Sequence, residues 1–178
     1  MWGWARAGFF PFYINETVSE WSSFDKSVAS RGHPIHEISV QLYDIRAVLK
    51  AFGVPAYLNI DIEDYDKFVI YALPGLDVFP KYVSVENGAP LMFESLVKAG
   101  YDNFMFVNQR DVPLARMPNP SSEGLSIDYV FKYGSSGPFG SDLSGVWLNA
   151  TAMRVFLEKW WAGAPETDSW YDLHASLA

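Results

Sequence analysis

Between residues 35 and 108, short runs of β-branched and aromatic residues alternate with stretches in which apolar residues recur at helical spacing. This alternation of strand and helix patterns is typical of a parallel sheet whose crossover helices pack on its faces. The clearest strand covers residues 57–63, where apolar and polar residues alternate with the period of two expected of a half-buried strand. The pattern predicts an α/β fold, with strands over 35–40, 57–63, 81–86 and 103–108 and helices over 43–52, 68–73 and 91–97.

The pattern changes after residue 108. Long loops rich in Pro, Gly and Ser are predicted over 111–124 and 134–140, with an aromatic strand over 127–133 between them. Because no helix separates this strand from 103–108, the two are expected to form an antiparallel pair at one edge of a mostly parallel sheet. Helices are predicted over 147–161 and 169–177.

A length of 178 residues suits a single domain. Within residues 1–178 we expect an irregular N-terminal segment over 1–34, which includes a short strand over 9–14, and an α/β core over 35–178. The 49% apolar content argues against disorder. The chain has no Cys, which excludes disulfide scaffolds, thiolate zinc sites and Cys nucleophiles.

The charge balance and hydropathy narrow the classes of partner. A net charge of −8 disfavours nucleic acid, because an acidic chain repels the phosphate backbone. No apolar stretch approaches the ~18 residues that indicate a membrane span. We therefore expect a cytoplasmic protein that binds neither nucleic acid nor membrane.

The first candidates for chemistry are Asp61 and Glu63, which share one face at the carboxyl end of a predicted central strand. In open α/β sheets this edge holds the ligand crevice. Two carboxylates there could orient a substrate, act as a base or hold a hard cation. Alternatively they cap the next helix or contact a neighbouring loop. No metal is expected, since nothing nearby in the sequence supplies a clear third ligand. Glu86 ends the next predicted strand and would face the same cleft if the two strands are neighbours.

Other motifs allow two interpretations each. The loop over 134–140 could be a substrate-side lid or an ordinary connector, and its spacing does not match a phosphate-binding loop. His33 and His36 favour a surface loop over a metal site. Asp172 and His174 could form a catalytic pair or belong to a packed C-terminal element. The many Trp and Tyr residues could stack on sugars, but they more often pack in a core.

Several segments together resemble the FkbM-type methyltransferases. The resemblance lies in residues 55–63, 80–86, 99–101 and 104–109, and a branch of the family is also similar over 12–15, 20–24, 134–140 and 170–174. The order and spacing of these segments cover about residues 10–175. The resemblance implies a Rossmann-like fold, S-adenosylmethionine as cofactor and methyl transfer, usually to the hydroxyl of a small molecule or sugar.

The resemblance also assigns expected roles to individual residues. Asp61 and Glu63 would be catalytic, whereas Ser23 and Glu86 would contact the cofactor. The substrate-binding residues would be Ser135, Ser136, Gly137 and Phe139.

The chain departs from the family pattern at three places. Asn59 stands where the family has Lys, and Asp64, a possible helix cap, stands where it has Gly. Nothing between residues 1 and 40 resembles the Gly-rich turn that holds the cofactor. We therefore expect the C-terminal portion of a methyltransferase, with a sheet that is incomplete on its N-terminal side and self-associates through an open edge. The alternative is a non-catalytic fragment of that fold that acts as an interaction or carbohydrate-binding module.

Overall fold

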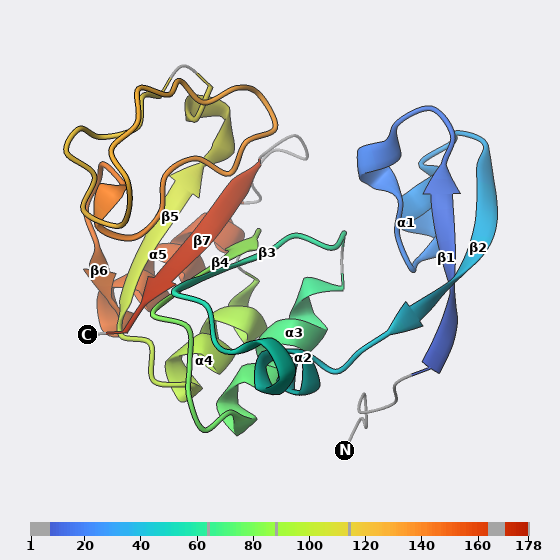
Figure 1. Ribbon diagram of the computed structural model, residues 1–178, viewed down its shortest axis with the longest axis horizontal. Helices are drawn as coiled ribbons and strands as arrows, with labels where there is room; N and C mark the ends of the chain where they lie inside the picture. The colour runs from blue at the N-terminus through green and yellow to red at the C-terminus, as the bar shows by residue number, and fades with distance from the viewer. Residues whose placement is uncertain (1–7, 64, 88, 114, 164–169, 178) are drawn as a thin grey trace.

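The computed structural model describes residues 8–63, 65–87, 89–113, 115–163 and 170–177. These residues form a two-stranded sheet and a five-stranded sheet (Figure 1). Helices gather beside the larger sheet, whereas the smaller sheet stands apart at the right of the view. The strands are β1 (Gly8–Asn15), β2 (Ile35–Leu42), β3 (Tyr57–Ile60), β4 (Tyr82–Glu86), β5 (Asn103–Asn108), β6 (Leu148–Asn149) and β7 (Tyr171–Ser176). The α-helices are α1 (Lys26–Ser30), α2 (Ile45–Phe52), α3 (Asp66–Ala72), α4 (Pro90–Lys98) and α5 (Ala150–Ala162), and the 3-10 helices are η1 (Ser19–Trp21), η2 (Leu73–Gly75), η3 (Gln109–Asp111) and η4 (Gly140–Asp142).

The smaller sheet is built by the N-terminal part of the chain. β1 runs antiparallel to β2, in a register that pairs Gly8 with Leu42 and Asn15 with Ile35. Asn15 is buried, and its side-chain nitrogen donates a hydrogen bond of 2.7 Å to the carbonyl oxygen of Ala29. This bond ties α1 to the end of β1. Residues 8–42 are called the β1–β2 unit below. In this unit β2 pairs with β1 and is not part of the larger sheet.

The larger sheet has the strand order β3-β4-β7-β5-β6. Among the strand pairs of the described residues, β3–β4 is parallel and the pairs β4–β7, β7–β5 and β5–β6 are antiparallel. Because β7 runs against both of its neighbours, β3, β4 and β5 all point in the same direction. The predicted mixed α/β fold is confirmed, but the prediction of a mostly parallel sheet is wrong.

The predicted antiparallel edge pair is also wrong. Strand β5 pairs with β7 and β6, whereas residues 127–133 form no strand and make a single bridge, between Val130 and Arg116. The aromatic composition of this segment favours a strand, yet Ile127 and Tyr129 are exposed. A strand pattern needs a surface that buries one of its faces.

The strand that separates β4 from β5 comes from the C-terminal segment, which the sequence pattern predicted to be a helix. In β7 the side chains alternate: Leu173 and Ala175 point to one face, and Asp172 and His174 point to the other. All four are buried. Since both faces of β7 are covered, it is a central strand, and its polar residues lie inside the protein rather than on a solvated face.

A layer of helices covers one face of the larger sheet. Neighbouring helices in this layer contact each other in the order α2, α3, α4 and α5. The core between this layer and the sheet contains Phe93 of α4, whose ring packs edge-on against Phe104 of β5 with centroids 4.9 Å apart. The opposite face carries polar side chains and is covered by part of the chain between β5 and β6.

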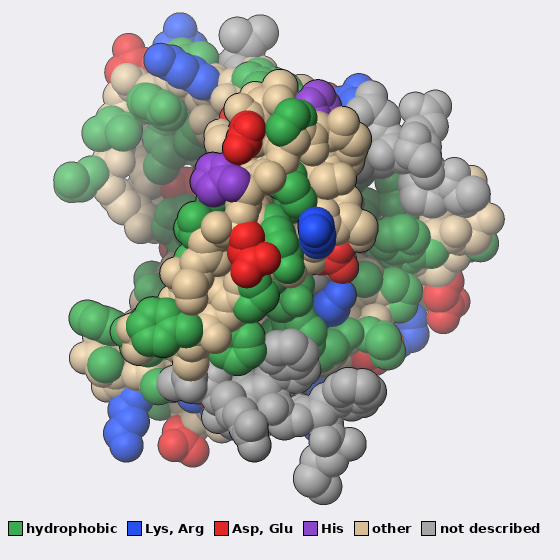
Figure 2. Space-filling view, turned by 90° about the vertical axis from the view of Figure 1, so that its right-hand side faces the viewer, with side chains coloured by type: hydrophobic (Ala, Val, Ile, Leu, Met, Phe, Trp, Pro, Cys, Tyr) green, Lys and Arg blue, Asp and Glu red, His purple; other side chains and the backbone are tan. Residues whose placement is uncertain are grey.

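No helix in the described part of the chain is both long and apolar enough to cross a membrane. Figure 2 views the molecule from the side of the β1–β2 unit. On this face Lys and Arg, Asp and Glu, and His are scattered among hydrophobic side chains. This face thus has mixed charge, which differs from the concentrated basic surface of nucleic-acid-binding proteins.

Candidate functional site

Three carboxylates meet where the parallel strands β3 and β4 end. Asp61 and Glu63 follow β3, and Glu86 is the last residue of β4. One carboxylate oxygen from each of the three lies within 4.8 Å of the others. The fold therefore brings together the three acidic residues that the sequence placed at one sheet edge, because parallel neighbours end on the same side. Asp64 lies outside the described residues, so its role as a helix cap stays a prediction.

Glu63 is held by the β1–β2 unit. Its backbone has a φ of +48°, in the left-handed region that a residue with a side chain seldom adopts. Arg31 donates a hydrogen bond of 2.8 Å from Nη2 to Glu63 Oε2, and Ser23 donates one of 2.8 Å from Oγ to the Glu63 carbonyl oxygen. Ser23 is fully buried. Its hydroxyl thus supports the loop of the site, and the structure does not expose it to a ligand.

Burial, with a smaller contribution from mutual repulsion, raises the pKa values of this cluster. Burial raises the pKa of Glu86 to about 7, and the negative charges of Asp61 and Glu63 add to the rise. Burial also raises the pKa of Asp61. For Glu63 burial again raises the pKa, although the guanidinium of Arg31 opposes it. A carboxyl group whose pKa lies near neutrality can exchange a proton at physiological pH.

A fourth carboxylate, Asp172 of β7, lies beside Glu86 but outside the group whose oxygens are within 4.8 Å of one another. Asp172 lies directly opposite Glu86 in the β4–β7 register, so both side chains point to the same face of the sheet. It is only 7% exposed. Burial raises the pKa of Asp172 to about 7, with further contributions from Asp61 and Asp66. The sequence analysis paired Asp172 with His174 and did not connect Asp172 to this site. The alternation of polar and apolar residues over 171–176 was the pattern that could have indicated a strand there.

The histidines do not take part in the carboxylate cluster. His174 is on the same sheet face as Asp172, opposite Ser84, and burial lowers its pKa to about 4. Its Nε2 has no hydrogen-bond partner among the described residues. His36 contacts Glu16 through Nδ1 at 3.1 Å, and the ring of His33 packs on Trp21. The two latter histidines therefore belong to the β1–β2 unit.

A pocket of about 550 Å³ opens beside the carboxylates. Its polar wall includes Arg31, Glu63 and Glu86, and its apolar wall includes Tyr71 and Met92. Pockets of this size hold cofactors and other small ligands. The remaining lining residues are Val28, Asp66, Lys67, Asn87, Ala89, Pro90 and Leu91.

The segment 134–140 lies over the polar face of the sheet, close to the end of β3. Asn59 donates a hydrogen bond of 2.9 Å from Nδ2 to Ser136 Oγ, and it accepts one of 2.7 Å from Ser84 Oγ. The ring of Phe139 stacks on Tyr57 with centroids 4.4 Å apart. The segment is thus joined to the strand that leads into Asp61.

The other residues assigned to substrate binding have structural contacts of their own. Ser135 Oγ accepts a hydrogen bond from the backbone N–H of Lys132. Gly137 has a φ of +78°, and a Cβ added to it would lie 3.2 Å from Cγ1 of Val112. These contacts fix the shape of the segment, which contacts β3 through Ser136 and Phe139. None of the residues 134–140, all within the described part of the chain, lines the pocket beside the carboxylates.

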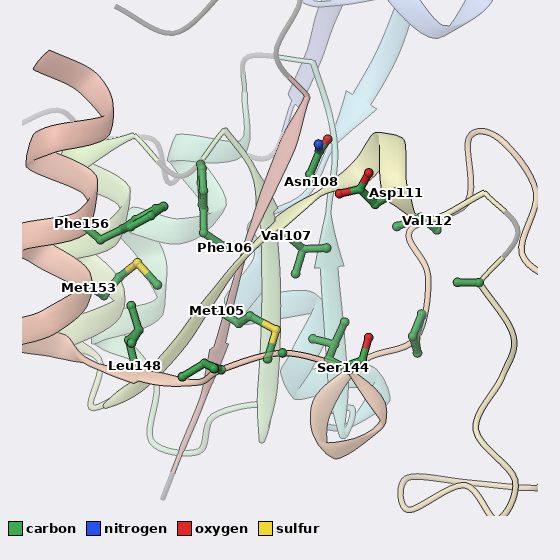
Figure 3. A pocket seen from close by; sticks show the side chains of 15 residues that line it. Met105, Phe106, Val107, Asn108, Asp111, Val112, Ser144, Leu148, Met153 and Phe156 are labelled. Atoms are coloured by element: carbon green, nitrogen blue, oxygen red, sulfur yellow. The ribbon is translucent and has the colours of Figure 1, made fainter. Parts of the chain in front are cut away.

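A second pocket, of about 480 Å³, lies on the other side of β7 and is mostly apolar. Figure 3 shows Met153 and Phe156 of α5 on one side of it, Met105 and Val107 of β5 at its centre, and Val112 and Ser144 on the other side. Val107 is opposite Asp172 in the β5–β7 register. One strand therefore separates this apolar pocket from the carboxylates.

Comparisons with known proteins found no relative: no protein-family model matches the chain, and no curated protein and no solved structure matches it. The function of the chain therefore has to be argued from the chemistry of the site at the ends of β3, β4 and β7.

Proposed function

We propose that this chain is an S-adenosylmethionine-dependent methyltransferase that methylates a hydroxyl oxygen of a small molecule or sugar. The observation that carries the proposal is the meeting of Asp61, Glu63 and Glu86 within 4.8 Å, at the carboxyl ends of two parallel strands. Ligands of open α/β sheets bind outside these strand ends. The adjoining pocket of about 550 Å³ gives a ligand room there.

The placement of the segments that resemble FkbM-type methyltransferases supports this proposal. Residues 55–63 and 80–86 contain β3 and β4, which are neighbours, and 170–174 contributes to β7 on the other side of β4. The antiparallel edge pair that the resemblance implies, 103–108 with 127–133, is not formed; β7 is instead the antiparallel neighbour of both β4 and β5. Segments far apart in the sequence thus converge on a single site, as they would if the resemblance reflects a shared activity.

The hydrogen-bond acceptor groups of the pocket fit the proposed cofactor. S-adenosylmethionine carries a sulfonium, an amino group and a ribose diol, which carboxylates can pair with or accept hydrogen bonds from. Glu86 and Asn87 would hold these polar groups, and Met92 and Tyr71 would line the apolar side. When bound, the cofactor supplies the methyl group.

The chain's own part in the reaction is to position the acceptor and to take its proton. Asp61 is accessible to solvent, and it would accept a hydrogen bond from the acceptor hydroxyl and orient its oxygen. Glu63, whose pKa is raised by burial, would take the proton as the oxygen–carbon bond forms and the sulfur–methyl bond breaks. Alignment of the reacting groups supplies much of the barrier reduction in such direct displacements. The segment 134–140 covers the polar face of the sheet at β3, through Ser136 and Phe139.

Calorimetric titration tests the proposal on the purified chain. S-adenosylmethionine and S-adenosylhomocysteine are titrated into the wild-type protein and into Glu86→Gln, with Glu158→Gln, an exposed acid on α5, as the matched control. We expect micromolar binding that is weakened about tenfold or more in Glu86→Gln and unchanged in the control. A folded wild-type sample that binds neither compound would overturn the proposal.

An acceptor assay then tests the role of Asp61. A panel of hydroxylated small molecules and sugars is incubated with isotope-labelled cofactor, and methyl incorporation is measured. We expect Asp61→Asn to bind the cofactor like the wild type but to transfer methyl groups at least about tenfold more slowly. Equal transfer rates would remove Asp61 from the mechanism.

A further inference from the structure

We propose that Asp61, Glu63, Glu86 and Asp172 form a binding site for a hard divalent cation such as Mg²⁺ or Mn²⁺. The first observation is geometric: oxygens of Asp61, Glu63 and Glu86 lie within 4.8 Å of one another. They come from two separate places in the chain, so the fold has to bring them together. Carboxylate oxygens are the ligands that hard divalent cations prefer.

The second, independent observation is the state of Asp172. Its side chain is only 7% exposed, lies opposite Glu86 in the strand register and points to the same face of the sheet. Within the described part of the chain, its carboxylate has no hydrogen-bond donor and no ion-pair partner. The charges that act on it are the like charges of Asp61 and Asp66. A buried carboxylate without a partner is unfavourable, and a cation between these groups would remove that penalty.

The positive side chains at the site leave part of this negative charge uncompensated. Arg31 pairs with Glu63 Oε2 at 2.8 Å, and both side chains are partly exposed. Arg31 and Lys67 also line the pocket, where they face Glu63, Asp66 and Glu86. Together with Asp61 and Asp172 there are five carboxylates and two cations, so a divalent cation would compensate most of the remaining charge.

The geometry also leaves room for other ligands of the cation. Glu86 and Asp172 lie within the sheet, whereas Asp61 is accessible to solvent. Mg²⁺ commonly keeps several waters when few carboxylates bind it. A cation here would therefore present exchangeable positions toward the pocket. One of these positions would hold the oxygen of a methyl acceptor, and this role of the cation rests on the proposed function. Binding of the cation itself needs neither cofactor nor acceptor.

Metal binding to the chain alone tests this inference separately from methyl transfer. The protein is treated with a chelator and titrated with Mn²⁺ by electron paramagnetic resonance and with Mg²⁺ by calorimetry. We expect one Mn²⁺ per chain, with a dissociation constant between about 10 µM and 1 mM. Glu86→Gln and Asp172→Asn should each weaken binding about tenfold or more, and the control Glu158→Gln should bind like the wild type.

Two further measurements keep the result interpretable. Circular dichroism and thermal melting establish whether each variant is folded, and Mn²⁺ should raise the melting temperature of the wild type but not of Glu86→Gln. Absence of Mn²⁺ binding at 5 mM (about five times the weakest expected dissociation constant), or equal binding in Glu86→Gln, would overturn the inference whatever the cofactor titrations show.

Discussion

The hydroxyl of Ser23 donates a hydrogen bond of 2.8 Å to the main-chain carbonyl oxygen of Glu63, and this bond joins the β1–β2 unit to the carboxylate cluster. The same hydroxyl accepts a hydrogen bond from the backbone N–H of Asp25, so it is satisfied on both sides. Next to this bond, the rings of Phe24 and Tyr65 pack with centroids 4.8 Å apart. The position of Glu63 therefore depends on a unit that lies outside the larger sheet.

Replacing Ser23 by Ala should loosen the site as well as destabilise the protein. The substitution removes a buried donor and leaves the Glu63 carbonyl unpaired, which costs about 1–2 kcal/mol of the free energy of unfolding. Mn²⁺ binding should weaken by a few-fold, because Glu63 loses its fixed position. Urea unfolding and Mn²⁺ titration measure the two effects, with Ser39→Ala, an exposed position on β2, as the control. Identical behaviour of the two variants would show that the bond does not position the site.

Gly140 allows the segment 134–140 to approach the sheet closely. Its φ is +60°, and an added Cβ would lie 2.7 Å from two ring atoms of Tyr82. Gly140→Ala should therefore lower the free energy of unfolding by about 1–3 kcal/mol. Gly124→Ala is the matched control, since nothing lies within 4 Å of its added Cβ. Urea unfolding compares the two, and an equal, small loss in both would contradict the close approach.

A single buried hydroxyl ties the start of β5 to the segment before β4. Tyr101 is 1% exposed, and its hydroxyl donates a hydrogen bond of 2.7 Å to the carbonyl oxygen of Pro80. Tyr101→Phe leaves this carbonyl without a partner and should lower the free energy of unfolding by about 1–2 kcal/mol. Tyr133→Phe, at an 80% exposed ring, should change it by less than about 0.5 kcal/mol. Thermal and urea unfolding of both variants check this difference.

The carboxylate cluster predicts an unusual pH dependence of stability. Burial raises the pKa of Glu86 and of Asp172 to about 7, so the folded protein holds protons that the unfolded chain releases above pH ~4.5. These two groups therefore make stability fall as pH rises from about 4.5 to 7. The charged groups that act on them, Asp61, Glu63 and Asp66, reinforce this direction.

His174 acts in the opposite direction over part of this range. Burial lowers its pKa to about 4, so its contribution to stability is present above the unfolded value near 6.5 and is lost as pH falls toward 4. Urea unfolding is measured at pH 5 and pH 7.5 in the absence of divalent cations. Between these pH values the free energy of unfolding of the wild type should fall relative to that of the double variant Glu86→Gln/Asp172→Asn. If the double variant keeps the wild-type pH dependence, the cluster does not control it.

The free edge of β3 predicts association between copies of the chain. In the described sheet β3 pairs with β4 on one side only, and Ile62 just beyond it is 43% exposed. An edge strand with unpaired backbone groups can pair with a second copy. Sedimentation velocity should detect concentration-dependent dimers at micromolar concentration. Ile62→Lys should weaken them, whereas Val155→Lys, at a similarly exposed position on α5, should not. A wild type that stays monomeric would contradict this prediction.

Much of the site was predictable from the sequence because its first three residues sit in local patterns. The period of two over 57–63 and the strand-like run over 81–86 place Asp61, Glu63 and Glu86 at strand ends. The helical spacing between these runs implies a crossover, which makes the two strands parallel; whether they are neighbours was left open by the sequence. The structure confirms this grouping, with carboxylate oxygens within 4.8 Å.

The pairing of strands that are distant in the sequence was determined by the tertiary structure alone. Residues 171–176 became a central strand because β4 and β5 both offer hydrogen-bonding edges to them, and this pairing brought Asp172 beside Glu86. Residues 127–133 have the composition of a strand but no buried surface to pack on, so they stay outside the sheet. Local patterns set side-chain periodicity along the chain, whereas strand order depends on which distant backbone edges and apolar faces are left to be covered.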